Sequence, residues 1–232
     1  DIYIILAARP GVGKSAFSLQ VAAHVAKSGG SVLFVSPEMS EKQLTYRLLS
    51  LESEVNHKNI TGREPLKAAE IENLKKAHER IVTMPLVIDD SSEQSVTDVR
   101  LKARRIQATS GLDLLVIDYL QLLCEGDDSK EAVTMVSRGL KAIAKDLCIP
   151  VWACSQLRRA YGDEVHRRPD KSQLRGSGQL EQDADAVILM WHPSQKDKSK
   201  VEIILDKNRH GPLNEFYLHF DKKTTKFSNE GW

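Results

Sequence analysis

The sequence contains little cysteine, no excess of charge of either sign and no apolar run long enough to cross a membrane. Its three cysteines, Cys124, Cys148 and Cys154, form no C-x-x-C pair. An odd number without metal-ligand spacing argues against a disulfide framework and against a zinc site, so we expect buried, reduced thiols. No apolar run approaches the roughly 18 residues that a membrane-spanning helix needs, and no signal peptide is visible. We therefore expect a cytoplasmic protein with no membrane partner.

The charges of the chain nearly cancel, with 33 Lys and Arg against 32 Asp and Glu and a formal net charge of +1. This balance neither supports nor excludes nucleic acid as a partner, so any phosphate-binding surface must be local. The length of 232 residues and the 41% share of hydrophobic residues suit one domain with a sizeable core. The chain lacks an initial Met and begins inside the apolar run IYIILAA, so we expect it to be a piece of a longer protein.

Apolar segments of strand length alternate with helical patterns along most of the chain. We expect strands over residues 2–7, 31–36, 85–89, the front of 112–123, 151–155, 186–191, 201–206 and 216–220. We expect helices over 15–28, from a capping box at 40–43 into the low fifties, 66–81, 95–108 and 130–148, and a polar loop region over 157–180. Nearly continuous apolar strands separated by helices predict a mostly parallel sheet covered on both faces. The last strands have no helices between them, which predicts an antiparallel extension at one edge of this single α/β domain.

The stretch ARPGVGKS, residues 8–15, is typical of a phosphate-binding loop between a strand and a helix. Backbone N–H groups at a helix start point outward and carry the positive end of the helix dipole, and the glycines allow close approach of phosphate oxygens. Lys14 would reach the β- and γ-phosphates, and the Ser15 hydroxyl would bind Mg²⁺. Ala8 stands where the strict pattern has Gly, at a position that needs a small residue more than it needs Gly. The nucleotide-binding residues that we expect are Arg9, Pro10, Gly11, Val12, Gly13, Lys14, Ser15 and Ala16.

Three polar residues follow other predicted strands at their carboxyl ends, where ligands bind in open α/β sheets. Asp118 ends the apolar run LLVI and is the candidate acid for Mg²⁺, although an aspartate there is also common at the start of a turn. Glu38 follows VLFVS and Gln156 follows VWACS, and each is a candidate for orienting or activating an attacking water. A carboxylate favoured by a helix start also accounts for Glu38, and a surface polar residue also accounts for Gln156.

Six stretches occur in an order that is specific in combination: AARPGVGKSAFSLQVA, VLFVSPEMSEKQLTYRLLS, LLVIDYLQLL, VSRGLKAIAKDLCIPVWACSQLRR, LRGSGQLEQDADAVILM and DKNRHGP. With these stretches the chain resembles the motor domain of the DnaB-type replicative DNA helicases, a hexameric branch of the RecA-like ATPases. The resemblance spans nearly the whole chain and implies a RecA-like P-loop fold.

The resemblance implies a role for each matching residue of the chain's own nucleotide site. Lys14 and Ser15 match the phosphate and magnesium residues, and Asp118 matches the magnesium-associated aspartate. Glu38, in S-P-E-M where the family commonly has S-L-E-M, matches the catalytic glutamate. Gln156, in S-Q-L, matches the glutamine that links nucleotide state to DNA contact.

Further matches imply residues that act on a neighbouring subunit and on DNA. Lys207 and Arg209, in K-N-R-H-G, match the lysine and arginine finger that act in the neighbour's site, although by themselves they fit a solvated turn after a strand. Arg175 and Gly178, in L-R-G-S-G, fall in the loop that grips single-stranded DNA, and Gly176 stands where the family often has Glu. Cations in this region can meet phosphates without reading sequence, although a solvated basic loop has the same composition. They are Arg158, Arg159, Arg167, Arg168, Lys171 and Arg175; of these, Lys171 and Arg175 join Gly176 and Gly178 as the expected DNA-binding residues.

The resemblance implies an ATP-driven helicase that uses Mg²⁺, translocates 5′ to 3′ on single-stranded DNA and works as a homo-hexamer in the full-length protein. It also implies a helicase loader and a primase as partners, and a bacterial or phage origin. The family's N-terminal domain and linker helix are absent from residues 1–232, so we expect this piece to oligomerise weakly. Two other classes remain open at this point: a RecA-like recombination ATPase that forms filaments, and a nucleotide-dependent scaffold that hydrolyses little.

Overall fold

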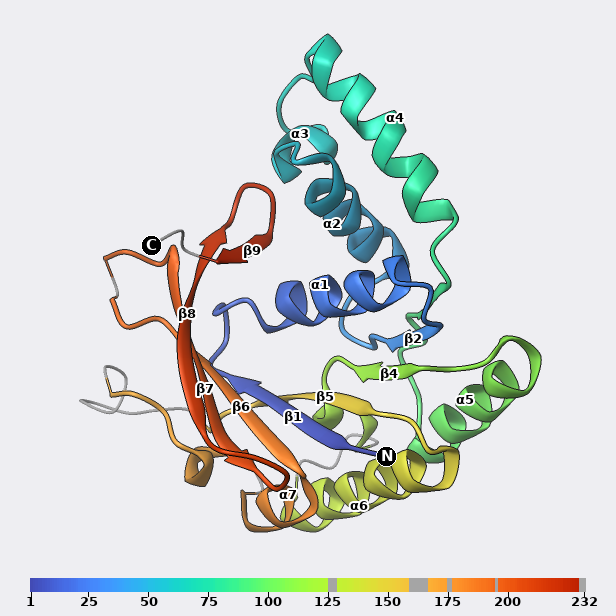
Figure 1. Ribbon diagram of the computed structural model, residues 1–232, viewed down its shortest axis with the longest axis vertical. Coiled ribbons are helices and arrows are strands. Elements are labelled where there is room, and N and C mark those ends of the chain that lie inside the picture. Colours follow the sequence, from blue (N-terminus) through green and yellow to red (C-terminus); the bar gives the residue numbers. More distant parts are fainter. Residues whose placement is uncertain (125–128, 159–166, 175–176, 195, 230–232) are drawn as a thin grey trace.

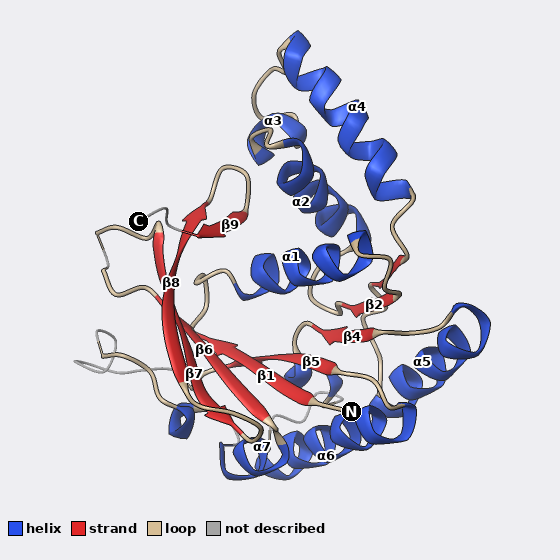
Figure 2. Cartoon of the chain, in the orientation of Figure 1, coloured by secondary structure: helices blue, strands red, loops and turns tan. Residues whose placement is uncertain are grey.

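A nine-stranded sheet runs through the molecule, and helices cover both of its faces (Figures 1 and 2). The computed structural model describes residues 1–124, 129–158, 167–174, 177–194 and 196–229. Within those ranges no helix is both long and apolar enough to cross a membrane.

The strands follow the order β3-β2-β4-β5-β1-β6-β7-β8-β9. From β3 to β6 in this order all neighbours are parallel, and β7, β8 and β9 are antiparallel, which confirms the predicted mostly parallel sheet with an antiparallel extension. The strand bounds are β1 Tyr3–Ala8, β2 Val32–Val35, β3 Leu86–Asp89, β4 Leu114–Ile117, β5 Val151–Gln156, β6 Ala186–Trp191, β7 Lys200–Asn208, β8 Asn214–Asp221 and β9 Lys226–Asn229.

The sheet is buried on both faces because successive side chains of its central strands point to opposite sides. In β1, Tyr3, Ile5 and Ala7 join the core on one face, whereas Leu6 and Ala8 join the core on the other. The first face is covered by α5 (Val96–Ser110), α6 (Lys130–Leu147) and α7 (Ser177–Asp183). The second is covered by α1 (Lys14–Lys27) and α2 (Glu41–Ser53), with α4 (Ala68–Val82) packed on α2.

The helix boundaries follow local signals. Ser40 and Gln43 form the predicted capping box: Gln43 N donates to Ser40 Oγ at 3.3 Å, and Ser40 N donates to Gln43 Oε1 at 3.0 Å. α6 begins after Ser129, whose Oγ accepts from Ala132 N at 3.1 Å, and ends at Cys148 in a left-handed conformation (φ 53°). These contacts satisfy backbone groups that a helix end leaves without partners. At this end of α6 the Cys148 thiol is exposed, so the expectation of buried thiols holds for Cys124 and Cys154 but is wrong for Cys148.

Several short elements were not predicted. They are α3 (His57–Ile60), η1 (Leu120–Leu123), η3 (Lys171–Gln173), α7 and β9. The last two changed the expected architecture: α7 replaces loop within residues 157–180, and β9 extends the sheet by one strand beyond β8. Short segments such as KFSN in β9 and SGQLEQD in α7 carry little periodic signal, because packing rather than intrinsic propensity stabilises elements of this length.

Candidate functional site

A cleft opens where the carboxyl ends of four parallel strands meet. β1, β2, β4 and β5 run parallel, and Ala8 at the end of β1 pairs with Gln156 at the end of β5. The cleft has a volume of about 420 Å³. Its lining residues are Pro10, Gly11, Gly13, Lys14, Ser15, Ala16, Glu38, Arg47, Gln156, Phe220, Lys222 and Thr225. The structure therefore brings most of the predicted loop together with Glu38 and Gln156.

The loop after β1 leaves the first N–H groups of α1 available to a ligand. Gly13 is the N-cap residue and offers no side-chain cap, and the first turn of α1 has no acidic residue. Gly11 and Gly13 have φ angles of 78° and 110°, which favour glycine. A Cβ on Gly13 would also lie 3.0 Å from Phe227 Cζ, a tight contact that adds to the backbone strain of a substitution there. A helix start of this kind attracts an anion.

The position of Ala8 explains why alanine can replace the glycine of the strict loop pattern. It is the last residue of β1, it is fully buried, and its φ is not in the left-handed region. Since a regular strand tolerates a Cβ, alanine meets the requirement for a small residue there.

Lys14 is a buried cation at the start of α1, with 9% of its surface exposed. Its ammonium makes no hydrogen bond or ion pair with the described residues. A buried charge without a counter-charge is unfavourable, so an anionic ligand in the cleft would stabilise it. The side chain therefore fits a phosphate-binding role.

Asp118 follows β4 and is 1% exposed. Its backbone N–H donates to Val35 O at 2.9 Å, but both carboxylate oxygens are buried without a hydrogen-bond partner in the described part of the chain. Burial raises the pKa of the nearby Cys154 thiol, and the Asp118 charge raises it further, whereas the Lys14 charge lowers it. Asp118 and Lys14 thus flank the same buried thiol.

Mg²⁺ fits the donors that this region offers. Magnesium prefers oxygen ligands, keeps several waters, and is bound through one or two protein groups together with substrate phosphates. The Ser15 hydroxyl and the partnerless Asp118 carboxylate match that pattern. Among the described residues there is no cluster of three or more His, Cys, Asp and Glu side chains that could hold a metal ion.

Arg47 is a residue of the cleft that sequence reasoning missed. It lies on α2 and faces the same cleft as Glu38. Burial lowers the pKa of the Arg47 guanidinium, and the Asp118 and Glu38 carboxylates act in the opposite direction. A signal was present, since Arg47 lies three residues after Leu44 and one before Leu48 on the buried stripe of α2, where a cation is unusual.

Gln156 is positioned by a buried neighbour, Gln121 of η1. Gln121 Nε2 donates to Ser155 Oγ at 3.0 Å, and Gln121 Oε1 accepts from Gln156 N at 3.5 Å. The end of β5 is therefore tied to η1, so that the Gln156 side chain enters the cleft beside the loop after β1.

The β8–β9 hairpin forms the remaining wall of the cleft. Phe220 and Phe227 stack with ring centroids 4.3 Å apart behind Gly13, and Lys222 and Thr225 line the cleft. Asp221 Oδ1 accepts from Lys223 N at 2.9 Å, and the Lys223 carbonyl accepts from His57 N at 2.8 Å. This wall was not predicted, because no strand was expected at residues 226–229 and hence no hairpin.

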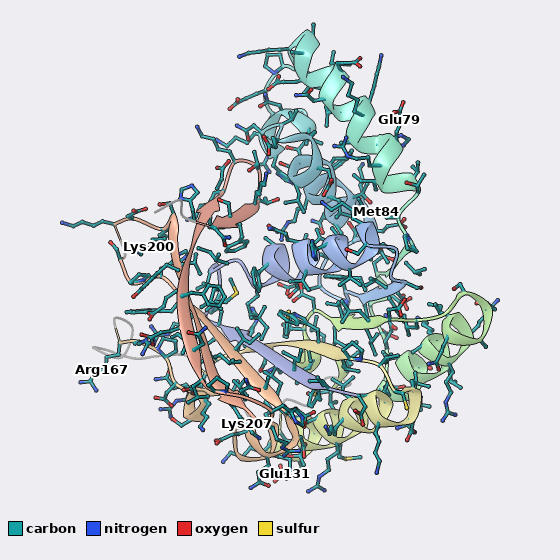
Figure 3. The ribbon with its side chains drawn as sticks, viewed as in Figure 1. Glu79, Met84, Glu131, Arg167, Lys200 and Lys207 are labelled. Atoms are coloured by element: carbon teal, nitrogen blue, oxygen red, sulfur yellow. The ribbon has the colours of Figure 1, made fainter. Side chains whose placement is uncertain are left out.

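Lys207 and Arg209 lie away from the cleft, at the opposite end of the strands, near the amino end of β6. β7 runs antiparallel to β6, and Lys207 pairs with Val187 near the start of β6, whereas Ala8 pairs with Met190 near its end. Figure 3 shows Lys207 near α7; its ammonium donates to Glu181 O at 2.5 Å. Burial lowers the pKa of Lys207, and the Arg209 charge lowers it further. Val187 and Met190 lie three residues, or roughly 10 Å, apart along β6, and contacts with Glu181 and Asp185 hold the Lys207 and Arg209 side chains at this end of the strands, away from the cleft of their own chain.

The predicted DNA-binding residues are only partly described. Arg175 and Gly176 lie outside the described residues. Gly178 lies in α7, where a Cβ would meet nothing within 4 Å. The Lys171 ammonium lies 3.3 Å from a carboxylate oxygen of Glu181.

Two neighbouring arginines of the basic segment differ in their surroundings. Arg168 pairs with Glu202 at 2.6 Å and with Glu215, and these hydrogen bonds raise the pKa of Arg168. Arg167 is exposed, its carbonyl accepts from Arg9, and its side chain extends to the periphery in Figure 3. Of these two expected phosphate contacts, Arg167 therefore fits the role better, because Arg168 is already paired with two carboxylates.

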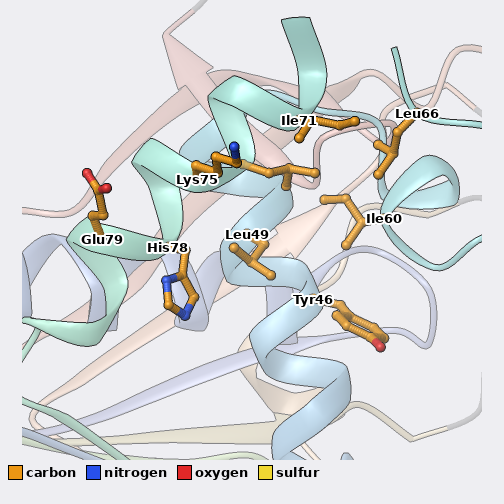
Figure 4. A pocket seen from close by; sticks show the side chains of 9 residues that line it. Tyr46, Leu49, Ile60, Leu66, Ile71, Lys75, His78 and Glu79 are labelled. Atoms are coloured by element: carbon orange, nitrogen blue, oxygen red, sulfur yellow. The ribbon is translucent and has the colours of Figure 1, made fainter. Parts of the chain in front are cut away.

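A second hollow, about 500 Å³ in volume, has a different character (Figure 4). It lies between α2, α3 and α4 and is lined by Tyr46, Leu49, Ile60, Leu66, Ile71, Leu74, Lys75, His78 and Glu79. Its lining is mostly apolar, unlike that of the cleft at the carboxyl ends of the strands.

Comparisons with known proteins agree with this geometry. The profile of a family described as "DnaB-like helicase C terminal domain" matches residues 1–229. The replicative DNA helicase DnaB of Geobacillus stearothermophilus is 40% identical over 237 residues, which cover 97% of this chain and 52% of the relative. The replicative DNA helicase DnaC of Bacillus subtilis (strain 168) is 39% identical with the same coverage. The chain thus spans about half the length of the curated relatives it matches.

Solved structures give the same result. A structure described as an ATPase domain superposes with a TM-score of 0.91 at 33% identity, covering 99% of this chain and 85% of that one. A structure described as a DnaB-like replicative helicase and its interactions with primase superposes with a TM-score of 0.90 at 33% identity, covering 99% of this chain and 57% of that one.

Proposed function

The chain belongs to the family of DnaB-like helicase C-terminal domains, and on that premise we propose that residues 1–232 form the ATP-hydrolysing motor domain of a replicative DNA helicase. In this proposal the domain works within a homo-hexameric ring that translocates 5′ to 3′ on single-stranded DNA and unwinds duplex DNA. We propose the cytoplasm of a bacterial cell as its location, whether a bacterium or a phage encodes it.

The single observation that carries the proposal is that the residues proposed to be catalytic lie at two opposite ends of the strands of one sheet. Phosphate-binding and carboxylate residues gather at the carboxyl ends of β1, β2 and β4, whereas Lys207 and Arg209 lie at the other end. Arg209 lies away from the cleft of its own chain and matches the family's finger motif. Both facts support a role for Arg209 in the nucleotide site of the next subunit. In a ring, each nucleotide would lie between the cleft of one subunit and the finger of its neighbour.

The cleft residues have complementary tasks in this proposal. The N–H groups before α1 and the Lys14 ammonium would hold the β- and γ-phosphates of ATP, while Ser15 and Asp118 would hold Mg²⁺. The ion, when bound, neutralises charge on the phosphate oxygens. Glu38 would accept a proton from the attacking water, and Arg47 would place a positive charge in the same cleft. Gln156, at the end of β5, would report nucleotide state to the DNA-binding segment that follows it.

Arg209 and Lys207 would supply positive charge where the transition state spreads negative charge over the phosphoryl oxygens. A trans-acting arginine is worth roughly 10³ to 10⁵ in rate in phosphoryl transfer. For DNA, the basic segment with Lys171, Arg175, Gly176 and Gly178 is the proposed contact, through phosphates rather than bases. We propose a primase and a helicase loader as further partners; one of the superposed helicases is described together with its interactions with primase.

The test is ATP hydrolysis against protein concentration, with and without single-stranded DNA. We expect turnover per subunit to rise with concentration, because each site needs a neighbour's finger, and to rise further with DNA. Turnover independent of concentration would contradict the trans-acting finger. Strand displacement from a forked duplex separates a helicase from a filament-forming ATPase, which would hydrolyse ATP without displacing a strand.

A variant test addresses the proposed catalytic carboxylate. We expect Glu38→Gln to keep nucleotide binding and to lose turnover, because an amide cannot accept the proton of the attacking water. Glu41→Gln, at the exposed start of α2, is the matched control. Unchanged turnover in Glu38→Gln would remove Glu38 from its role, and low turnover in the unmodified chain would favour the scaffold class.

A further inference from the structure

Asp185 joins the start of β1 to the residue proposed as the finger. It lies between α7 and β6 and is 3% exposed. Its backbone N–H donates to Tyr3 O at 2.8 Å, and its carbonyl accepts from Arg209 N at 2.8 Å. Its carboxylate makes a second contact with each residue: Oδ2 accepts from Tyr3 N at 2.8 Å, and Oδ1 accepts from Arg209 Nη1 at 3.0 Å. Both the main chain and the side chain of Asp185 therefore hold Arg209.

The contacts fix the plane of the Arg209 guanidinium without using all of its donors. Nη1 donates to Asp185 and Nη2 donates to Gln182 O, at 3.3 Å. A guanidinium is planar with five N–H donors in a rigid fork, so two contacts at different nitrogens set its orientation. The Arg209 side chain remains 50% exposed, which leaves other donors accessible to a ligand from outside the chain.

The charge on Asp185 is maintained by its surroundings. Burial alone would raise the pKa of this carboxyl, but hydrogen bonds from Lys141 and the Tyr3 N–H, together with the charges of Lys141 and Arg209, lower it below its usual value. The ionised group thus serves two cations, Lys141 from α6 and Arg209 from the turn after β7.

We propose that Asp185 is the positioning residue of the trans-acting finger: it orients Arg209 toward the nucleotide site of the next copy of the chain. The same carboxylate binds the first residue of β1, the strand whose other end carries the chain's own phosphate-binding loop. Each copy would therefore hold its own loop and the finger it offers in a fixed mutual orientation. This inference rests on the proposed function, since it requires Arg209 to act in a neighbour's site.

A mixing experiment with the full chain separates an effect on the finger from an effect on the chain's own site. Subunits with Asp185→Asn keep their own cleft but misplace the finger, whereas subunits with Lys14→Ala lose their own cleft but keep the finger. We expect Asp185→Asn alone to lower kcat by about 10²-fold, the cost of misplacing a catalytic group by about 1 Å, with little change in KM for ATP. Mixed with Lys14→Ala subunits, it should regain turnover, because the Asp185→Asn cleft then meets an intact Arg209.

Two controls keep the outcomes distinct. Arg209→Ala mixed with Lys14→Ala tests the trans-acting finger itself; without recovery in that mixture, the proposed function fails and this inference with it. If the Arg209→Ala mixture recovers turnover and the Asp185→Asn mixture does not, the positioning role alone is overturned. The loss in Asp185→Asn would then be a general folding defect, which a neighbour's intact finger cannot repair. Lys141→Met removes the other cation of Asp185 but leaves its contacts with Tyr3 and Arg209, so kcat should fall less than in Asp185→Asn. If Asp185→Asn does not fold, as judged by circular dichroism, Asp185→Glu retains the charge, shifts the carboxylate and serves in the same mixtures.

Discussion

Gln20 and Phe227 exchange two hydrogen bonds: Gln20 Nε2 donates to Phe227 O, and Phe227 N donates to Gln20 Oε1, each at 2.7 Å. The side-chain amide of Gln20 on α1 thus pairs with backbone groups of β9, the last strand in the order of the sheet. The same helix begins at Lys14, so the helix that presents the phosphate-binding loop also fixes the hairpin wall of the cleft.

We expect Gln20→Ala to lower both the free energy of unfolding and the affinity for nucleotide. Each lost hydrogen bond is worth about 0.5–1.5 kcal/mol, so the pair should cost about 1–3 kcal/mol, measured by urea unfolding. Affinity should fall because Lys222 and Thr225 lose their fixed position; a fluorescent nucleotide reports this. His24→Ala, at an exposed position of α1, is the control. Equal behaviour of the two variants would contradict the role of Gln20.

Asp118→Asn should reduce activity without reducing stability. The carboxylate is buried without a hydrogen-bond partner among the described residues, and such a charge is unfavourable in the folded protein. We expect an equal or higher melting temperature, while Mg²⁺-dependent turnover falls by about 10²-fold or more, as for the loss of a group that stabilises transition-state charge. Melting and turnover are measured on one preparation. A clear loss of melting temperature would show that Asp118 has a structural partner instead.

Arg167 and Arg168 should contribute differently to DNA binding. Arg168 is held by Glu202 and Glu215, whereas Arg167 is exposed at the periphery. We expect Arg167→Ala to weaken binding of single-stranded DNA and to reduce the slope of log affinity against log salt by about 0.7, the contribution of one phosphate contact. Arg168→Ala should instead lower stability, because Glu202, 4% exposed, would lose its counter-charge. Fluorescence anisotropy over a salt series measures the first effect, and the reverse ranking would contradict it.

Stability should fall on mild acidification, in part through His192. This ring is 6% exposed, its Nδ1 lies 3.1 Å from Lys200 O, and its Nε2 is buried without a partner in the described part of the chain. Burial lowers the pKa of His192 below its ordinary value of 6.5; the hydrogen bond to the Lys200 carbonyl raises it in part, and the charges of Lys222 and Lys198 lower it further.

Because the folded-state pKa of His192 is the lower one, its neutral ring contributes stability above about pH 6.5 that is lost as the pH falls toward the folded-state value. We expect the free energy of unfolding to decline below that pH, and His192→Gln to make the decline shallower. His24→Gln, at an exposed position, is the control. An identical pH profile for His192→Gln and the unmodified chain would exclude this contribution. Burial also lowers the pKa of His57, so part of the decline should remain in the variant.

Much of the parallel half of the fold followed from local pattern. The apolar runs around Leu33, Leu115 and Ala153 are strands because both of their faces are buried, and the capping box at Ser40 starts α2 where expected. Asp118, Glu38 and Gln156 could be placed near the phosphate-binding loop for a topological reason: parallel strands end at one edge, so residues that follow them converge.

Other parts of the site could not be placed from local pattern. Arg47 lies on a helix whose pattern predicts only burial, and its proximity to Glu38 depends on how α2 packs over the sheet. Lys222 and Thr225 reach the cleft only because Gln20 and the His57 backbone hold the hairpin against α1 and α3.

The sequence by itself determined the family, the alternation of strands and helices, and the position of the predicted phosphate-binding loop, because each depends on residues close together in the chain. Tertiary structure alone decided which residues complete the cleft and that Arg168 pairs with two glutamates. It also decided that Arg209 lies at the end of the strands away from the cleft, where it is hydrogen-bonded to Asp185. These relationships join residues separated by up to 207 positions, and they arise from the register of antiparallel strands and the packing of side chains, which no local periodicity encodes.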